Sequence, residues 1–174
     1  MKTMMRALLL AFVIFAAQNF AEAQSKIGFI YGDSLLLEMP EYDSVLTKIN
    51  KRSEEYKKTI SSMQDELDAK STKFQRDQAK PDIPKSYLEL AQNELESMYQ
   101  NIQTFSQNAQ KELMEYQNKL MEPLITKMKN ACAEVSKEQK YDFIVDAGSN
   151  LFWHMSEKDN LMNAVRKKLG LSTK

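Results

Sequence analysis

Few side chains in this sequence could carry out catalysis or hold a metal ion. There is one histidine, His154, and one cysteine, Cys132. A metal site or an acid–base pair needs further ligands or partners of these types, so both are disfavoured. The four glycines, at positions 28, 32, 148 and 170, form no phosphate-binding loop. We therefore expect no enzymatic activity and no cofactor, and we interpret Cys132 as a thiol packed in a helix core.

Positive charge gathers in a short stretch around two prolines, Pro81 and Pro84. Between residues 70 and 85 five basic side chains oppose two acidic ones, which gives a local charge of +3. The five are Lys70, Lys73, Arg76, Lys80 and Lys85. Such a patch is typical either of a solvated turn or of a surface that contacts an anionic membrane, lipopolysaccharide or acidic protein loops.

The chain begins with the features of a secretory signal peptide. A positively charged start and an apolar run over residues 7–17 are followed by small residues in A-x-A spacing, which predicts cleavage before Gln24. The run is too short for a membrane-spanning helix, which needs about 20 residues. We therefore expect residues 1–23 to be removed and the mature chain to be exported and soluble.

The charge and cysteine content of the mature chain exclude further classes of function and limit how the chain can be stabilised. Removal of the signal segment leaves 22 basic and 23 acidic side chains. This near-neutral balance does not favour binding to nucleic acid, which requires a basic surface. With one cysteine no internal disulfide can form, so the stability of an exported chain must come from packing or from assembly.

The long middle of the chain carries two heptad patterns and contains no glycine between Gly32 and Gly148. In the first pattern, apolar or aromatic residues fill eight of the ten positions 42, 46, 49, 53, 56, 60, 63, 67, 70 and 74. The second pattern runs from Leu88 to Val135, with a stutter at positions 105, 109 and 113. The two patterns predict two long helices with an elongated packing seam.

Three prolines mark the limits and the course of these helices. Pro40 suits the first turn of the first helix, and Pro84 suits the start of the second. We expect residues 80–84 to form the turn of an antiparallel helical hairpin that spans residues 41–140. Pro123 lies inside the second pattern, and we expect it to bend that helix rather than end it, because the apolar periodicity continues beyond it.

The two ends of the mature chain, residues 24–40 and 141–174, predict a small β body with a final helix. Residues 26–31, 141–147 and 150–155 read as short strands, the last two flanking a hairpin-like turn at Gly148 and Ser149. So small a sheet is marginal alone, and we expect an oligomer to complete it. Its predicted core residues are Ile27, Phe29, Ile30, Phe143, Ile144, Val145, Leu151, Phe152 and Trp153.

This order of elements resembles the Skp (OmpH-like) periplasmic chaperones over essentially the whole mature chain. The stretches that carry the resemblance are "KIGFIYGDSLLLEMPEY", "MEPLITKMKNACAEVSKEQKYDFIVDA" and "GSNLFWHM". The resemblance implies a mostly helical α+β fold, with a hairpin arm on a β body that is completed by trimerisation. It also implies a periplasmic holdase that works without ATP and shields unfolded outer-membrane β-barrel proteins in a cavity between three arms. The best-known members are strongly basic, whereas this chain is basic only at residues 70–85.

A different class of function remains open from the residues alone. Regular heptads are equally typical of a structural coiled-coil spacer, or of an envelope adaptor with one folded partner. A spacer should be a rigid rod with a permanent partner, whereas a chaperone should bind several unrelated unfolded barrels.

Overall fold

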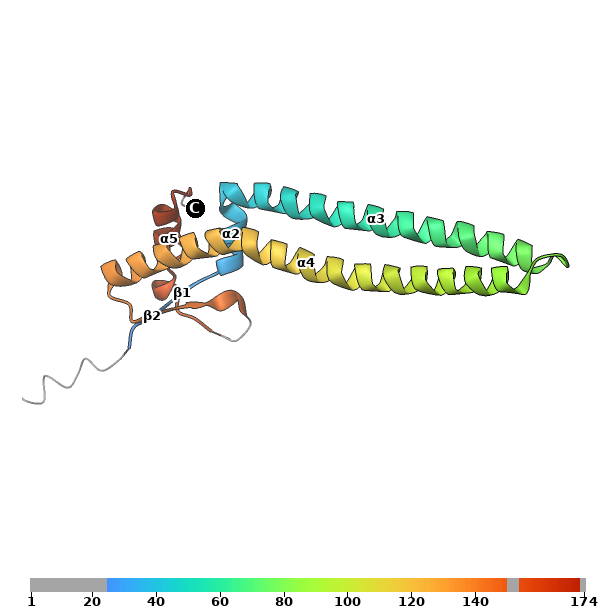
Figure 1. Ribbon diagram of the computed structural model, residues 1–174. Helices are drawn as coiled ribbons and strands as arrows, with labels where there is room; N and C mark the ends of the chain where they lie inside the picture. The colour runs from blue at the N-terminus through green and yellow to red at the C-terminus, as the bar shows by residue number, and fades with distance from the viewer. Residues whose placement is uncertain (1–24, 150–153, 173–174) are drawn as a thin grey trace, which may run out of the picture. The chain divides into compact units, whose positions relative to one another are not determined.

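The computed structural model describes residues 25–149 and 154–172. By their contacts, residues up to Leu36 group with those from Lys127 onward, and we call this unit the body. Residues Leu37–Thr126 form a second unit, which we call the arm. Most described residues are helical and a small sheet lies in the body, so the predicted α+β, mostly α class is confirmed (Figure 1).

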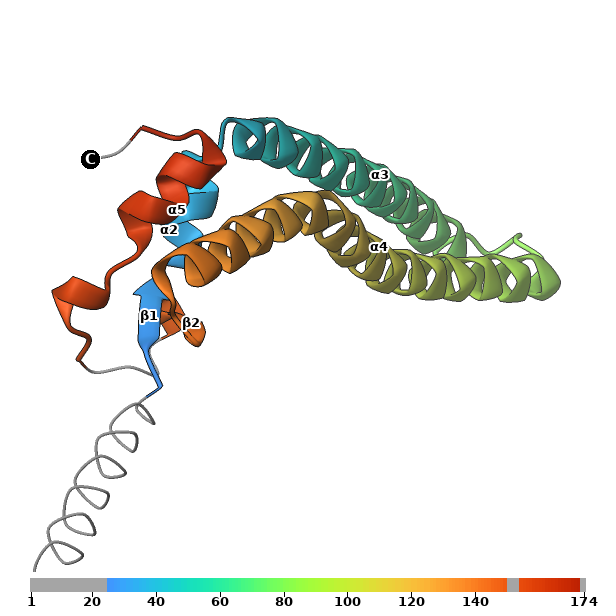
Figure 2. The same cartoon turned by 90° about the vertical axis from the view of Figure 1, so that its left-hand side faces the viewer.

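Two long helices make up the arm. Helix α3 spans Pro40–Gln78 and helix α4 spans Lys85–Gln139, the residues of α4 from Lys127 belonging to the body. Within the arm the two helices run side by side in opposite directions and are joined by a short turn (Figures 1 and 2). The antiparallel hairpin predicted from the heptads is therefore confirmed.

The residues that the heptads placed in the seam are the ones that the two helices cover. Along α3 each predicted position from Ile49 to Phe74 is partly buried, while the residues between them are mostly exposed. One position differs near the start of α3. Leu46 is 37% exposed, and its neighbour Val45, at 6%, is buried instead. The seam is thus shifted by one residue there, as a helix of 3.6 residues per turn allows.

The prolines lie at the positions expected from the sequence. Pro40 occupies the first turn of α3, and the acidic Glu41 and Asp43 accompany it, where they favour the positive end of the helix dipole. Pro123 lies inside α4, which continues to Gln139. The bend expected at Pro123 stays a prediction.

The sheet of the body has two parallel strands among the described residues. Strand β1 (Ile27–Ile30) pairs with β2 (Phe143–Asp146) in a register that sets Ile27 opposite Phe143. Because all of α2, α3 and α4 lies between the two strands in the sequence, the whole arm is a crossover connection. The first two predicted strands are therefore present, each slightly shorter than expected.

The predicted third strand and its hairpin turn are not seen in the described residues. Residues 150–153 lie outside them, and His154 and Met155 have no regular secondary structure. In place of a hairpin turn, Ala147–Ser149 forms a short 3₁₀ helix, η2. The backbone N–H of Gly148 donates to Asp146 Oδ1 at 2.9 Å, and this local bond favours a tight turn over continued strand.

Two short helices contribute residues to the core of the body. Helix α5 (Met162–Leu169) follows a 3₁₀ turn, η3 (Glu157–Asp159), and ends at Gly170 with a φ of 73°, the left-handed conformation that glycine adopts readily at a helix C-terminus. Helix α2 (Gly32–Glu38) is an addition to the elements expected from the sequence, which assign residues 24–40 to the β body without a helix. The core lies between these elements and the last turns of α4, and consists of Ile30, Leu35, Ala131, Val135, Tyr141, Leu161, Met162, Val165 and Leu169.

Candidate functional site

The predicted β-core residues divide into buried and exposed ones. Phe29 and Ile30 are buried, with exposures of 0% and 5%. Ile27 and Phe143, which are direct partners in the sheet register, are 46% and 59% exposed. Ile144 and Val145 are partly buried, and Leu151, Phe152 and Trp153 lie outside the described residues. An exposed apolar pair therefore sits at one end of the sheet.

A carboxylate at the end of β2 holds three segments of the body together. Asp146 Oδ1 accepts hydrogen bonds from the backbone N–H groups of Gly32 at 3.1 Å and Gly148 at 2.9 Å. Gly32 is the first residue of α2, and an acidic acceptor at this N-terminus is favoured by the helix dipole. The aspartate that closes β2 thus fixes the start of α2 and the η2 turn.

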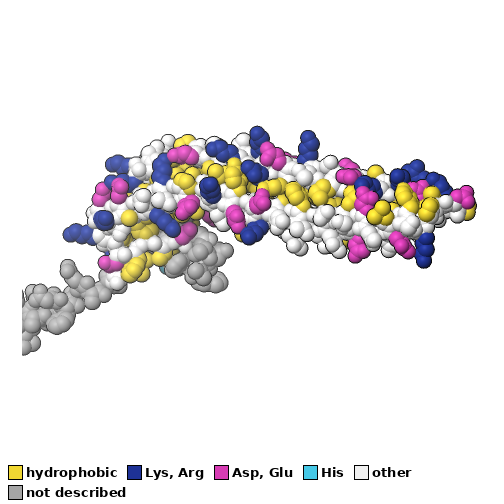
Figure 3. Space-filling view, in the orientation of Figure 1, with side chains coloured by type: hydrophobic (Ala, Val, Ile, Leu, Met, Phe, Trp, Pro, Cys, Tyr) yellow, Lys and Arg dark blue, Asp and Glu magenta, His cyan; other side chains and the backbone are white. Residues whose placement is uncertain are grey.

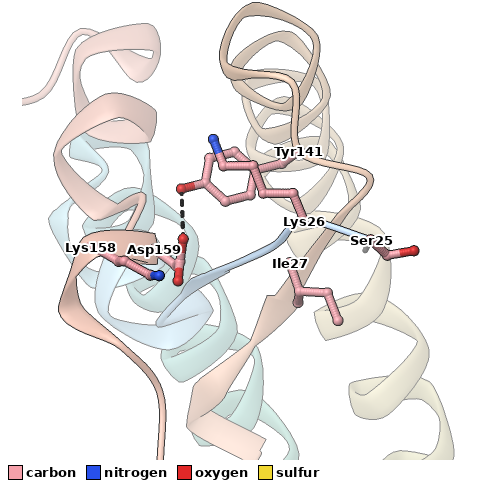
Figure 4. A pocket seen from close by; sticks show the side chains of 6 residues that line it. All are labelled: Ser25, Lys26, Ile27, Tyr141, Lys158 and Asp159. Atoms are coloured by element: carbon pink, nitrogen blue, oxygen red, sulfur yellow. Dashed lines mark hydrogen bonds between the residues drawn. The ribbon is translucent and has the colours of Figure 1, made fainter. Parts of the chain in front are cut away.

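An open pocket of about 670 Å³ lies in the body (Figure 4). At its centre the Tyr141 hydroxyl donates to Asp159 Oδ1 at 3.1 Å, and the Lys26 ammonium lies 3.8 Å from the centre of the Tyr141 ring. Burial, and then the Asp159 carboxylate, raise the pKa of Tyr141, so the phenol is neutral at physiological pH. The remaining lining residues are Ser25, Ile27 and Lys158. The Tyr141–Asp159 hydrogen bond ties η3 to the segment between α4 and β2.

A second polar contact links α5 to α4 on the surface of the body. The Lys168 ammonium pairs with Glu138, and with Glu134 at 3.4 Å. These carboxylates, Glu138 first, raise the pKa of Lys168. Cys132, on the same stretch of α4, is partly buried and its pKa is raised by burial and by the nearby Asp146 charge. It packs against the core, which confirms its helical core position.

Aromatic and charged side chains set the register of the arm. Tyr56 Oη donates to Glu112 at 2.6 Å, and its ring meets Phe105 edge to face with centroids 6.2 Å apart. One turn earlier in α3, the Arg52 guanidinium lies 4.9 Å from the ring centre of Tyr116. An aromatic contact such as Tyr56–Phe105 contributes on the order of 0.5–1.5 kcal/mol, and the Arg52–Tyr116 contact adds a weak cation–π attraction. They align the helices along the seam.

The turn of the hairpin is organised by a buried carboxylate that the sequence reading did not single out. Asp77 is 7% exposed and accepts from Lys80 Nζ at 2.7 Å and from the Tyr87 hydroxyl at 3.3 Å. These donors, Lys80 first, lower the pKa of Asp77. A signal was present, since an aspartate three residues before a lysine at a helix end is a common local pair.

The first residue of the predicted basic patch is neutralised by the opposite helix. Lys70 on α3 forms an ion pair with Glu94 on α4, and lies 3.7 Å from Glu66 on its own helix. The Glu94 carboxylate is the main reason that the pKa of Lys70 is raised. Lys70 occupies a seam position, so its charge acts within the hairpin rather than as a contact surface.

The rest of the patch is divided between paired and exposed cations. Lys80 is bound to Asp77, and Lys85 lies 4.0 Å from Glu89. Lys73 and Arg76 are exposed, and neither forms an ion pair within residues 25–149 and 154–172. Any contact of this patch with an anionic surface would therefore depend mainly on these two side chains. A small groove of about 140 Å³ beside them is lined by Lys70, Lys73, Phe74, Tyr87, Ala91, Glu94 and Leu95.

The part of the chain that the structure describes contains neither a cluster of metal ligands nor a helix that could span a membrane. No group of three or more metal-ligating side chains gathers within residues 25–149 and 154–172. Across the same residues, every helix is too short or too polar to cross a membrane.

The fold is that of an α+β, mostly α protein in which a long helical hairpin forms the crossover between two parallel strands. Comparison with known families identifies one that matches most of the chain: the family model "Outer membrane protein (OmpH-like)" matches residues 26–169. The chain is a member of the OmpH-like family. This confirms the resemblance seen in its sequence.

A solved structure shares the fold at low sequence identity. It belongs to an OmpH-like protein from Caulobacter crescentus CB15 that is described as a candidate outer membrane chaperone. The TM-score is 0.66, the sequences are 14% identical, and the match covers 86% of each chain. Among curated proteins no match was found.

Proposed function

We propose that this protein is an ATP-independent holdase of the periplasm that binds unfolded outer-membrane β-barrel proteins and prevents their aggregation. The observation that carries the proposal is the seam of the arm in a chain of the OmpH-like family. Apolar side chains such as Ile60, Met63 and Leu67 are only partly covered by the partner helix. A hairpin with half-covered apolar residues along its length can offer many weak contacts to a chain whose exposed β segments would otherwise aggregate.

The proposed working form is a homotrimer of the mature chain, cleaved before Gln24. The exposed Ile27 and Phe143 side chains support association through the body, because a pair of large apolar groups at the end of a small sheet is stabilised by burial against another subunit. Three arms would then surround one client. The exposed Lys73 and Arg76 would be the contact with an anionic membrane surface or lipopolysaccharide.

The test is suppression of aggregation. An unfolded β-barrel protein is diluted from urea into buffer with and without the mature chain, and light scattering is followed. The proposal expects scattering to fall towards zero near three chains per client, without ATP, for several unrelated barrels. Unchanged scattering would refute it and favour the spacer, which binds one folded partner and ignores unfolded chains.

A further inference from the structure

The middle of the arm carries a surface without charge. Fourteen consecutive residues of α4, 97–110, include no Asp, Glu, Lys or Arg. The twelve residues before them contain four charged side chains and the twelve after them contain five. On the face shown in Figure 3, uncharged surface occupies the middle of α4 between charged groups on either side.

A short part of the facing α3 helix is uncharged as well. The Tyr56–Phe105 ring contact and the Lys70–Glu94 ion pair fix the register between the helices. In that register, residues 59–64 of α3, "TISSMQ", lie alongside part of the 97–110 segment of α4, and charged residues of α3 flank them on both sides, at 57–58 and 65–66. We call these two segments together the uncharged band. At 1.5 Å per residue its α4 segment is about 21 Å long.

The exposed side chains of the band are mainly primary amides. Its larger apolar residues Met98, Ile102 and Phe105 are covered in the seam. The exposed amides of the α4 segment are Gln100, Asn101, Gln103, Gln107, Asn108 and Gln110. Within the described part of the chain, the one side-chain bond that any of them makes is from Gln103 to the Tyr99 hydroxyl at 3.3 Å. Their donors and acceptors are otherwise turned to solvent.

Helix stability does not account for this composition. Asparagine is a poorer helix former than glutamate or lysine, and i,i+4 pairs of opposite charge would stabilise an exposed helix face. The same helix carries such pairs on either side of the band, Lys85 with Glu89 and Lys111 with Glu115. The band therefore lacks the i,i+4 ion pairs that stabilise the neighbouring parts of α4.

We propose that the uncharged band is a client-contact surface, where the amides pair with the backbone N–H and C=O groups of an unfolded chain. This rests on the function proposed above. A side-chain amide offers two donors and an acceptor, as the peptide group does, and the pairing carries no preference for client charge. Unfolded barrel strands present unpaired backbone groups at every residue. A second copy of this chain fits less well, since an interface between folded arms would have an apolar centre and Tyr99 is the one large apolar side chain exposed on this α4 segment.

The test introduces charge into the band and, as a matched control, beside it. Two variants carry Gln100→Glu with Gln107→Glu, or Gln100→Lys with Gln107→Lys. Two controls make the same changes at the exposed Gln92 and Gln117 of the same helix. Circular dichroism verifies equal helicity. The affinity for labelled, urea-diluted barrels is measured by fluorescence anisotropy, with one acidic and one basic client.

The proposal expects both band variants to weaken binding of both clients at least about fivefold, and the controls to change it less than twofold. Effects that reverse sign with client charge would mean ordinary electrostatics and would overturn the proposal. Band variants that bind both clients like wild type would also overturn the proposal. A changed sedimentation coefficient of the band variants would overturn it too, because it would show that the band is a contact between arms. If wild type itself binds no client, the proposed function fails and the band loses its role with it. Wild-type binding with unaffected band variants refutes the band alone.

Discussion

Gly32 and Asp146 approach so closely that a larger residue at position 32 would displace the Asp146 carboxylate. The Gly32 N–H donates to Asp146 Oδ1 at 3.1 Å, and a Cβ added to Gly32 would lie 2.6 Å from Oδ2. Because the same oxygen that receives this bond also accepts from Gly148, the carboxylate cannot shift without loosening the η2 turn. The start of α2 and the end of β2 are therefore mutually dependent.

Gly32→Ala should destabilise the body. Overpacking of this kind costs about 1–3 kcal/mol, and here the hydrogen bond from residue 32 would also lengthen. Urea unfolding followed by circular dichroism measures the loss. Ser34→Ala, at an exposed position of the same helix, is the control and should stay within about 0.5 kcal/mol of wild type. Equal midpoints for Gly32→Ala and wild type would contradict the contact.

Leu35→Ala should lower the free energy of unfolding by about 2–5 kcal/mol, because Leu35 is 0% exposed and its removal leaves a cavity in the core. Leu37→Ala, two residues along α2 and 64% exposed, should cost little. The two variants are compared in one urea series. Similar losses at both positions would mean that α2 packs differently from the arrangement described.

Acid should loosen the turn of the hairpin. Because its donors lower the pKa of Asp77, the carboxylate stabilises the folded turn above its unfolded pKa of about 3.9, and this stabilisation is lost as pH falls through the lower folded value. We expect the protection factors of the amides around residues 77–87, which are corrected for the intrinsic pH dependence of exchange, to fall below about pH 4, and to be lower in Asp77→Asn already at neutral pH. Asp82→Asn, at an exposed position of the same turn, is the control. Identical exchange in Asp77→Asn and wild type would contradict this role.

Cys132 should react slowly in the folded protein. Burial and the Asp146 charge both raise the pKa of the thiol, so little thiolate is present at pH 8. Labelling with a disulfide reagent should be at least about tenfold slower in buffer than in urea, and Asp146→Asn should speed the folded rate. A folded rate equal to that in urea would show that Cys132 is accessible.

Reversal of the two exposed cations near the turn should weaken binding to anionic membranes. Each basic side chain near such a surface contributes about 1 kcal/mol, so Lys73→Glu with Arg76→Glu should lower vesicle affinity at least about tenfold. Vesicles with phosphatidylglycerol are compared with phosphatidylcholine alone. Lys48→Glu with Lys51→Glu, which has the same spacing on α3 and is also exposed, serves as control. Equal vesicle binding by both variants would exclude the patch as a membrane contact.

The arm could be predicted closely because its signals are local. Heptad spacing fixed which residues are covered, and Pro40 and Pro84 placed the helix starts within one residue. The exception, Val45 for Leu46, comes at the start of α3, where a one-residue shift changes the covered face. Local patterns do not tell which cations are paired, because the Lys70–Glu94 contact joins residues 24 positions apart.

The structure of the body was less predictable because contacts between residues far apart in the sequence determine it. Helix α2 begins where Asp146, 114 residues away in the sequence, accepts from its first N–H group. No pattern around Gly32 contains that information, so the sequence does not predict this helix. The pairing of β1 with β2 likewise depends on the whole crossover between them. The end of the final helix, by contrast, depends on a local signal, because Gly170 adopts the left-handed conformation that stops it.

The proposed function is tested most directly by native mass spectrometry of the mature chain with an unfolded β-barrel client. The account predicts a complex of three chains and one client, formed without ATP and with several unrelated barrels. A monomer or dimer whose mass is unchanged by every client would contradict it.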